Sequence, residues 1–414
     1  MFVRFTNKMT AAGVQRSLPQ TAGISARGTA FVENSYQGYN PGRALRPSAK
    51  VLPEHARTHN RSLVLQTLYR SGQLSRADIA RSTGLTRVTV SDLVGEFISE
   101  GLIVETGQSE DIRPGKPATL LEINPSAFQI VGIDLSDSSQ FRGALLDIDG
   151  NIIERREVEL SGSTGSEATA KVVKLADELV GLATSPLLGI GVGSPGIVDL
   201  NGVVLSAPNL GWTNVDLQTQ LISHFGVPVI VGNDANAAVL AEHSFGQAHG
   251  DMMLIKLGHG VGAGLLLDGV PLYGSRFAAG EIGHVVVGTH GGLPCVCGKA
   301  GCLETWLSVP RLDAALKAAE DAGIAKSEVL SDAGTHLGIA LAAIVGALNL
   351  SEIVLSGPTR ILDGPLEEAT IETLRSRTMA EFHGNLTLRK TTLGDDIVMR
   401  GAAVMVLSGQ LGVS

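Results

Sequence analysis

Three segments between residues 61 and 98 carry apolar residues at helical spacing. The first ends at Gly72, the second begins at Ser75, a favourable N-cap, and ends at Gly84, and the third begins at Thr86. The residues expected to face inward are Val64, Leu65, Leu68, Ile79, Ala80, Val90, Leu93, Val94, Phe97 and Ile98. Short helices around a glycine turn predict a helix-turn-helix, and two strands around a polar loop in residues 102–125 add a wing.

From residue 128 onward, short apolar strands alternate with helices. The predicted units are three strands joined by tight turns (130–160), an amphipathic helix (166–183), a buried strand ending in a glycine loop (187–199), a strand, loop and helix (227–246), a strand hairpin (251–275), a last strand-to-loop unit (352–358) and a closing helix (395–411). Because the hairpin at residue 251 repeats the pattern at residue 130, the sequence predicts two similar α/β lobes rather than one large sheet.

These patterns predict four parts of the chain. They are a disordered basic extension (1–55), a winged helix-turn-helix (56–124), a first lobe completed by a C-terminal helix (125–245 with 394–414) and a second lobe (246–393). The extension is rich in Pro, Gly, Ser, Asn and Arg and has no sustained apolar period. Alternatively, translation starts further along the chain.

Composition narrows the class of protein. Hydrophobic residues make up 44% of the 414 residues, enough for more than one core, and aromatic residues only 4%. No run approaches the roughly 18 apolar residues of a membrane span, and the first residues lack the apolar core of a secretory signal. Three closely grouped cysteines provide no disulfide framework, so we expect a cytoplasmic protein.

Charge is divided unevenly along the chain. The formal net charge is −9, but residues 1–120 hold 15 Lys and Arg against 9 Asp and Glu, which leaves 17 against 32 in residues 121–414. A basic N-terminal part followed by an acidic remainder suggests that the N-terminal part binds a polyanion, although charged tails also increase solubility.

All the sulfur of cysteine lies within eight residues, in Cys295, Cys297 and Cys302. Zinc needs four ligands in a tetrahedron, and His284 or His290 can supply the fourth. A cluster of buried, reduced thiols is the alternative. The density of the cluster favours metal, and its spacing is not the C-x-x-C of redox proteins.

Acidic side chains flank this loop. Glu281 and Glu304 lie close to it in sequence, and rigid carboxylates beside an imidazole suit a polyhydroxylated ligand. Asn233 and Asp234 follow a predicted buried strand, where ligands of α/β sheets usually bind. Asp234 is therefore a candidate general base toward a sugar hydroxyl, or alternatively only the N-cap of the next helix.

Four stretches together resemble one known family. GEIGHVVV…CVCGKAGCLE, GNDANAA, GVGSPGIVD…APNLGW and LGHGVGAGLLLDG are similar to the ROK family of sugar kinases and NagC/XylR-type repressors, from about residue 60 to the C-terminus. The resemblance implies an α/β fold in which a winged helix-turn-helix precedes a two-lobed, actin-like ATPase (ribonuclease H-like) domain.

The resemblance also implies roles for individual residues. Structural zinc would be held by His284, Cys295, Cys297 and Cys302, with His290 still open as a ligand. Sugar hydroxyls would be bound by Asn209, Asn233, Asp234, Glu281, His284 and Glu304, with the loop of residues 194–196 in the same cleft. His284 would then serve both the metal and the sugar, one ring nitrogen each.

The nucleotide-binding motifs depart from those of the family's kinases. Residues 134–139 read DLSDSS where the kinases have Asp-x-Gly-Gly-Thr, and Asp137 adds negative charge where phosphates would lie. His259 stands where the kinases usually carry Thr, and Ser356 and Pro358 interrupt the glycine run of the adenosine-side turn. We therefore expect no catalysis, with Asp234 a vestigial base; the alternative is an active ATP-dependent sugar kinase with an added DNA-binding domain.

The expected function is a sugar-responsive DNA-binding regulator, more often a repressor than an activator, of carbohydrate genes. Its helix at residues 86–98 would enter the major groove. The candidate DNA contacts are Thr86, Arg87, Thr89 and Ser91 in that helix, and Arg113 and Lys116 in the wing. The expected partners are a palindromic double-stranded operator, a sugar or sugar-phosphate effector and a second copy of the chain, in a homodimer or higher oligomer, with no membrane.

Overall fold

The structure is a computed structural model that describes residues 53–108, 118–248, 250–288, 292–379 and 386–412. The predicted basic extension lies almost wholly outside these residues, as do Arg113, Lys116 and His290.

The N-terminal part of the described chain is a winged helix-turn-helix. Its elements are α1 (Pro53–Ser71), β1 (Leu74–Ser75), α2 (Arg76–Thr83), α3 (Arg87–Ser99), β2 (Ile103–Gln108) and β3 (Thr119–Ile123). The three strands form one antiparallel sheet in the order β1-β3-β2. Ser75 caps α2 in a capping box, and Gly84 closes that helix in the left-handed conformation, as the sequence predicts.

Two details of this domain differ from the prediction. Helix α1 begins at Pro53, well before the apolar period that starts near Arg61, because its first turns carry few apolar residues to mark them. Ile98 was expected in the inward stripe of α3, but it is 36% exposed, whereas Val90, Leu93, Val94 and Phe97 are fully buried. The buried stripe of α3 is therefore narrower than predicted.

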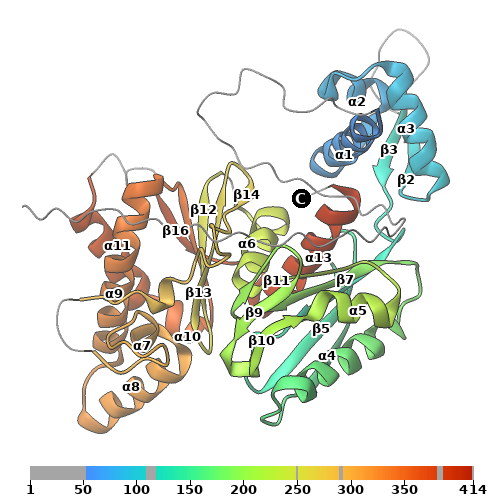
Figure 1. The fold of residues 1–414 in the computed structure, drawn as a ribbon. Helices are drawn as coiled ribbons and strands as arrows, with labels where there is room; N and C mark the ends of the chain where they lie inside the picture. Colours follow the sequence, from blue (N-terminus) through green and yellow to red (C-terminus); the bar gives the residue numbers. More distant parts are fainter. Residues whose placement is uncertain (1–52, 109–117, 249, 289–291, 380–385, 413–414) are drawn as a thin grey trace, which may run out of the picture. The chain divides into compact units, whose positions relative to one another are not determined.

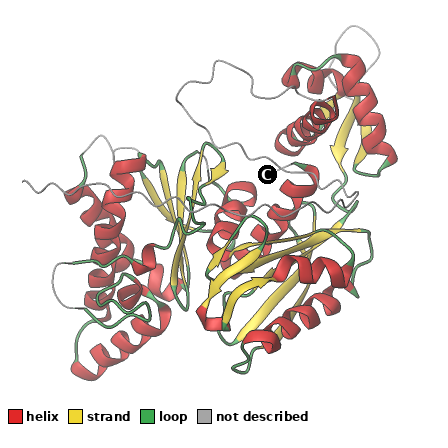
Figure 2. Ribbon diagram, in the orientation of Figure 1, coloured by secondary structure: helices red, strands yellow, loops and turns green. Residues whose placement is uncertain are grey.

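The rest of the described chain is built on two five-stranded sheets (Figures 1 and 2). If the strands are counted from the first strand of each lobe, both sheets have the order 3-2-1-4-5. The first sheet, in the order β11-β7-β4-β5-β6, comprises β4 (Gln129–Asp134), β5 (Gln140–Asp147), β6 (Ile152–Glu159), β7 (Leu187–Ser194) and β11 (Val229–Asn233). The second, in the order β14-β13-β12-β15-β16, comprises β12 (Met252–Leu257), β13 (Val261–Leu267), β14 (Val270–Pro271), β15 (Glu352–Ser356) and β16 (Thr387–Lys390). The predicted pair of similar lobes is confirmed.

Further elements surround these sheets. The first lobe adds α4 (Gly165–Val180), α5 (Leu217–Phe225), a small sheet of β8 (Ile197–Val198), β9 (Val203–Ala207) and β10 (Trp212–Asp216), and the 3-10 helix η1 (Pro208–Leu210). The second adds the 3-10 helix η2 (Ile282–His284), α7 (Glu304–Leu307), α8 (Val309–Ala322), α9 (Lys326–Leu348), α10 (Thr359–Leu362) and α11 (Pro365–Arg377). Strand β16 was not predicted, because its sequence, TLRK, has one strongly apolar residue and it lies at a sheet edge.

Helix α9 is the one helix, among the described residues, that is long and apolar enough to span a membrane by length and composition. No such segment was predicted. It packs closely on α11, where a Cβ at Gly334 would lie 2.3 Å from the carbonyl oxygen of Leu366, and it supplies Leu337, Leu341 and Val345 to the core of the second lobe. These contacts are those of a core helix in a globular domain.

Two helices connect the sheets. Helix α13 (Ile397–Leu411) packs on β4 and β7 of the first sheet, and α6 (Asp234–Phe245) packs mainly on β12 and β13 of the second. The two helices also pack against each other, and this contact is extensive (Figure 1). The sequence places α6 in the first lobe, but most of its sheet contacts are to the second. Residue Asp234, the first residue of α6, therefore lies where the two lobes meet.

The contact between these helices depends on glycine, and this gives a stability prediction. A Cβ at Gly401 of α13 would lie 1.8 Å from the backbone oxygen of Ala237 in α6. We expect Gly401→Ala to force the helices apart and to lower the free energy of unfolding by about 3 kcal/mol in chemical denaturation. The matched control is Gly346→Ala in α9, where a Cβ would meet nothing within 4 Å and helix propensity predicts a gain of about 1 kcal/mol. A cost below about 1 kcal/mol for Gly401→Ala would contradict this packing.

Candidate functional site

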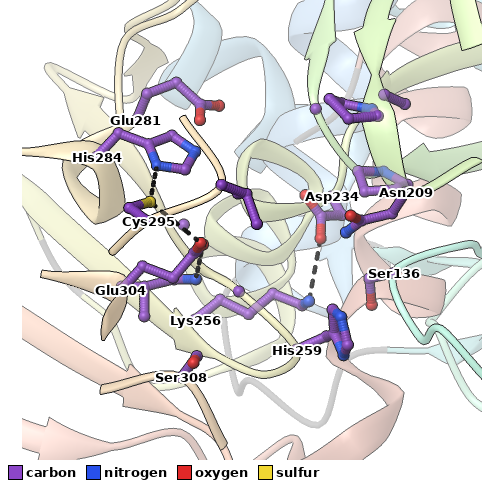
Figure 3. A pocket seen from close by; sticks show the side chains of 18 of the residues that line it. Ser136, Asn209, Asp234, Lys256, His259, Glu281, His284, Cys295, Glu304 and Ser308 are labelled. Atoms are coloured by element: carbon purple, nitrogen blue, oxygen red, sulfur yellow. Dashed lines mark hydrogen bonds and ion pairs between the residues drawn. The ribbon is translucent and has the colours of Figure 1, made fainter. Parts of the chain in front are cut away.

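A cavity of about 300 Å³ collects side chains from both lobes (Figure 3). Its polar lining residues are Ser136, Asn209, Asn233, Asp234, Lys256, His259, Glu281, His284, Cys295, Glu304, Thr305, Ser308 and Arg311. All six predicted sugar-binding residues are among them. Pro195 and Gly196 of the predicted loop also line the cavity, whereas Ser194 is buried and does not.

Asp234 lines this cavity, and hydrogen bonds to both of its carboxylate oxygens hold it in place. Its Oδ1 accepts from the backbone N–H of Ala235 at 2.9 Å and from Nδ2 of Asn233 at 3.2 Å, and its Oδ2 accepts from Nζ of Lys256 at 3.0 Å. The alternative that Asp234 is the N-cap is wrong. Asn233 is the N-cap, because its side chain accepts from the N–H of Asn236 and its backbone is extended.

Sequence reasoning missed Lys256. The signal was a lysine within MMLIKL, an otherwise apolar stretch predicted to be a strand of a hairpin. Burial by itself would lower the pKa of Lys256, but attraction to Asp234 and Asp134 outweighs it and the pKa is raised. The ammonium group therefore carries its charge at neutral pH.

Two glutamates, Glu281 and Glu304, lie across the cavity from Asp234 (Figure 3). Glu304 Oε2 accepts from the N–H of Val261 at 3.2 Å, and a Cβ at Gly260 would lie 2.7 Å from that oxygen, so the glycine lets the carboxylate approach the loop. The pKa of Glu281 is raised, first by burial and then by repulsion from Asp234. These carboxylates can accept hydrogen bonds from hydroxyl groups.

The cysteine hairpin lies beside these glutamates. His284, Cys295, Cys297 and Cys302 offer ligand atoms that all lie within 4.8 Å of one another. Sγ of Cys295 is 3.5 Å from Nδ1 of His284, and Sγ of Cys297 is 3.5 Å from Sγ of Cys302. Gly298 and Gly301, with φ of 87° and 77°, make the turns that bring the thiols together. Three thiols and an imidazole are a donor set typical of structural zinc.

Side chains of residues 134–139, the stretch that stands where the family's kinases have their phosphate-binding glycines, pair with neighbouring groups. Buried Asp134 pairs with Arg142 at 2.7 Å, and Ser138 Oγ lies 3.1 Å from Nδ1 of His259, so a hydrogen bond joins loops of the two lobes. Asp137 accepts from the backbone and side chain of Ser139 at 2.7 Å each. Burial raises the pKa of Asp137, but hydrogen bonds from Ser139 and from the backbone of Gln140, together with attraction to Arg142, outweigh burial and the pKa is lowered. The negative charge therefore remains.

The candidate DNA-contacting residues that can be placed lie at the start of α3. Thr86 is the N-cap and accepts from the N–H of Thr89, while Arg87 and Ser91 are exposed. The hydroxyls of Thr86 and Thr89 are 2.9 Å apart, so both already have a partner. Val88, which sequence reasoning did not select, is 70% exposed at the same helix end. An exposed apolar side chain between polar candidates suits contact with a thymine methyl group.

Comparison with known proteins matches both parts of the chain. Residues 130–408 match the ROK family, and residues 73–103 match bacterial regulatory proteins of the crp family. A putative xylose repressor of Caldicellulosiruptor sp. (strain Rt8B.4) is 29% identical over 388 residues, covering 85% of this chain and 96% of the repressor. A glucokinase of Halalkalibacterium halodurans is 30% identical over 311 residues, covering 67% of this chain and 94% of the kinase.

A solved structure extends the comparison to the whole architecture. The crystal structure of a ROK family transcriptional regulator, a homologue of the Escherichia coli Mlc protein, matches with a TM-score of 0.77 and 25% identity. It covers 87% of this chain, and 98% of the regulator is covered in return. The expected fold, a winged helix-turn-helix followed by a two-lobed actin-like domain, is confirmed. The chain belongs to the ROK family.

Proposed function

We propose that this protein is a sugar-responsive, DNA-binding transcription regulator, and specifically a repressor of genes for carbohydrate uptake or metabolism. The observation that carries the proposal is the presence, in one chain, of a helix-turn-helix and a cleft lined by carboxylates and amides that can bind a sugar. In residues 134–139 of this cleft, side chains replace the glycines of the kinases' phosphate-binding motif. The similarity to a putative xylose repressor over 85% of the chain supports it, because that match extends into the helix-turn-helix.

The metal would have a structural role in this account. Zinc would have four protein ligands here, His284, Cys295, Cys297 and Cys302. A tetrahedral site in which the protein supplies every ligand is typical of structural zinc. Because Nδ1 of His284 faces Cys295, the other ring nitrogen is available to the cavity that the residue lines. The ion would therefore fix both the cysteine hairpin and one sugar-binding ring.

Sugar binding would act on DNA through the relation between the lobes. Sugar contacts come from both lobes, with Asn209 and Asp234 on one side and Glu281 and Glu304 on the other. A bound sugar would favour one closure of the lobes and shift the population toward it. In a homodimer this would change the spacing of two DNA-binding domains and release a palindromic operator.

The experiment that tests the proposal is selection of DNA by the purified protein. Genomic fragments retained with and without each candidate sugar would be sequenced. The proposal predicts enrichment of a palindromic sequence that one sugar class removes. Retention of fragments without any shared sequence, or no change with any sugar or sugar phosphate, would contradict it.

A sugar kinase is the second candidate, favoured by the similarity to a glucokinase and by the presence of Asp234. We expect no turnover, because Asp137 puts charge near the site of phosphate binding and like charges about 4 Å apart cost about 1 kcal/mol or more. The measurement is ADP release from ATP over a panel of hexoses. Release above the background of an Asp234→Asn control would establish the kinase instead.

A further inference from the structure

Lys256 is a charged residue within a buried strand. Its neighbours in β12, Ile255 and Leu257, are buried, and in the ladder it lies opposite Gly262 of β13 and Ser356 of β15. The Lys256 side chain is 17% exposed, and it reaches the cavity beside Asp234 (Figure 3). A buried ammonium is costly unless it is paired, so this lysine requires an explanation.

The ammonium has more donors than protein acceptors. It carries three N–H bonds, and among the described residues its hydrogen-bond acceptor is Asp234, at 3.0 Å. Asp134 attracts it electrostatically but is itself paired with Arg142 at 2.7 Å. Because Lys256 lines the cavity, its other N–H bonds are available to an oxygen atom of a bound ligand.

The charges of the cavity decide which kind of ligand oxygen fits. The described residues that line it include three carboxylates, Asp234, Glu281 and Glu304, and two permanent cations, Lys256 and Arg311. Arg311 is exposed and donates to the backbone oxygen of Pro294 at 3.3 Å. The other cation, Lys256, is already paired with the carboxylate of Asp234.

A phosphate ester fits this balance poorly. It would add a charge of about −1.5 to −2 beside Asp234, and the lining cation that is paired with a backbone oxygen rather than a carboxylate, Arg311, is exposed to solvent. A neutral hydroxyl fits well, because it donates its proton to Asp234 Oδ2 and accepts a hydrogen bond from Lys256. The acceptor and donor for such a hydroxyl are 3.0 Å apart on the wall of the cavity.

We infer that the effector is an unphosphorylated sugar and that one of its hydroxyl groups bridges Asp234 and Lys256. The inference rests on the proposed function, which leaves the phosphorylation of the effector open. It makes Lys256 a ligand-binding and specificity-determining residue.

Calorimetric titration of the full-length protein tests the inference. Neutral pentoses and hexoses and their phosphate esters would be compared as ligands. We expect a neutral sugar to bind at least tenfold more tightly than its ester. Lys256→Met should weaken its binding by about tenfold to a hundredfold, the effect of a lost charged hydrogen bond. The control Lys174→Met removes an exposed lysine of α4 and should leave binding unchanged.

A series of deoxy sugars distinguishes a direct hydrogen bond between Lys256 and the sugar from a general effect of the substitution on the cavity. In the wild type, the analogue that lacks the bridging hydroxyl should bind at least tenfold more weakly than the parent sugar. In Lys256→Met the same analogue should lose less affinity than it does in the wild type, since the hydrogen bond to Lys256 is already gone and only the one to Asp234 remains. If this variant does not fold, Lys256→Gln, which keeps a donor without the charge, is titrated in its place.

Two results overturn the inference. One is an ester that binds more tightly than the neutral sugar. The other is a deoxy analogue that loses as much affinity in the Lys256 variant as in the wild type. Either would leave the proposed sugar-responsive function standing, whereas the absence of binding by every sugar and every ester would contradict that function as well.

Discussion

Replacing Cys302 with Ser is expected to lower the affinity for zinc more than a hundredfold and to abolish the response to sugar. Cys302 is fully buried, and its Sγ is 3.5 Å from that of Cys297. Structural zinc sites contribute about 10–16 kcal/mol in small domains, so loss of one thiolate should have the largest effect in this part of the protein. Without the ion, the hairpin would no longer fix His284 toward the cavity.

The measurements are the zinc content of the purified chain and calorimetric titration with the sugar. Leu293→Ser is the matched control, because Leu293 lies in the same hairpin, is 51% exposed and is not among the residues that line the cavity. It should retain one zinc per chain and the affinity of the wild type. If Cys302→Ser retains both, or if wild-type protein is metal-free yet responds to sugar, the zinc assignment is wrong.

Replacing Arg87 with Ala is expected to weaken operator binding by about 30-fold or more. Arg87 is exposed at the first turn of α3, the helix expected in the major groove. One arginine contact to a base is worth about 1–3 kcal/mol, and a dimer on a palindrome would lose two of them. Fluorescence anisotropy with operator DNA at several salt concentrations measures the loss of affinity and shows whether a base contact or a phosphate contact has been lost.

The salt dependence distinguishes two kinds of contact. A lost phosphate contact would reduce the salt slope by about 0.9 per site, whereas a lost base contact would relax sequence preference instead. Arg81→Ala is the control, because Arg81 is exposed on α2 and pairs with Asp78 of its own helix. An equal loss of affinity in both variants would contradict the placement of α3 in the major groove.

The sequence predicted the elements whose pattern is local. The capping box of Ser75 and the left-handed Gly84 follow from side chains within four residues, and both are present. The repeated hairpin at residues 130 and 251 predicted the two lobes, because each sheet places its apolar strands in the same order. The six sugar-site candidates line one cavity, and four of the five metal-ligand candidates form one cluster, while the fifth, His290, lies outside the described residues.

What the sequence could not supply depends on contacts between distant segments. Strand β16 is defined by its pairing with β15, and the exposure of Ile98 depends on how α3 packs in the folded domain. Lys256 could be read as a solvated lysine until the fold placed it 3.0 Å from Asp234. A buried charge is visible only once its partner, 22 residues away in the chain, is known.

The most direct test of the whole account is release of operator DNA by the sugar in the absence of nucleotide. Anisotropy of labelled operator would be followed as the sugar is added, and the half-maximal concentration compared with the dissociation constant from calorimetry. The account predicts release at a matching concentration, with no effect of added ATP and magnesium. Operator binding that ignores the sugar, or release that requires ATP, would contradict it.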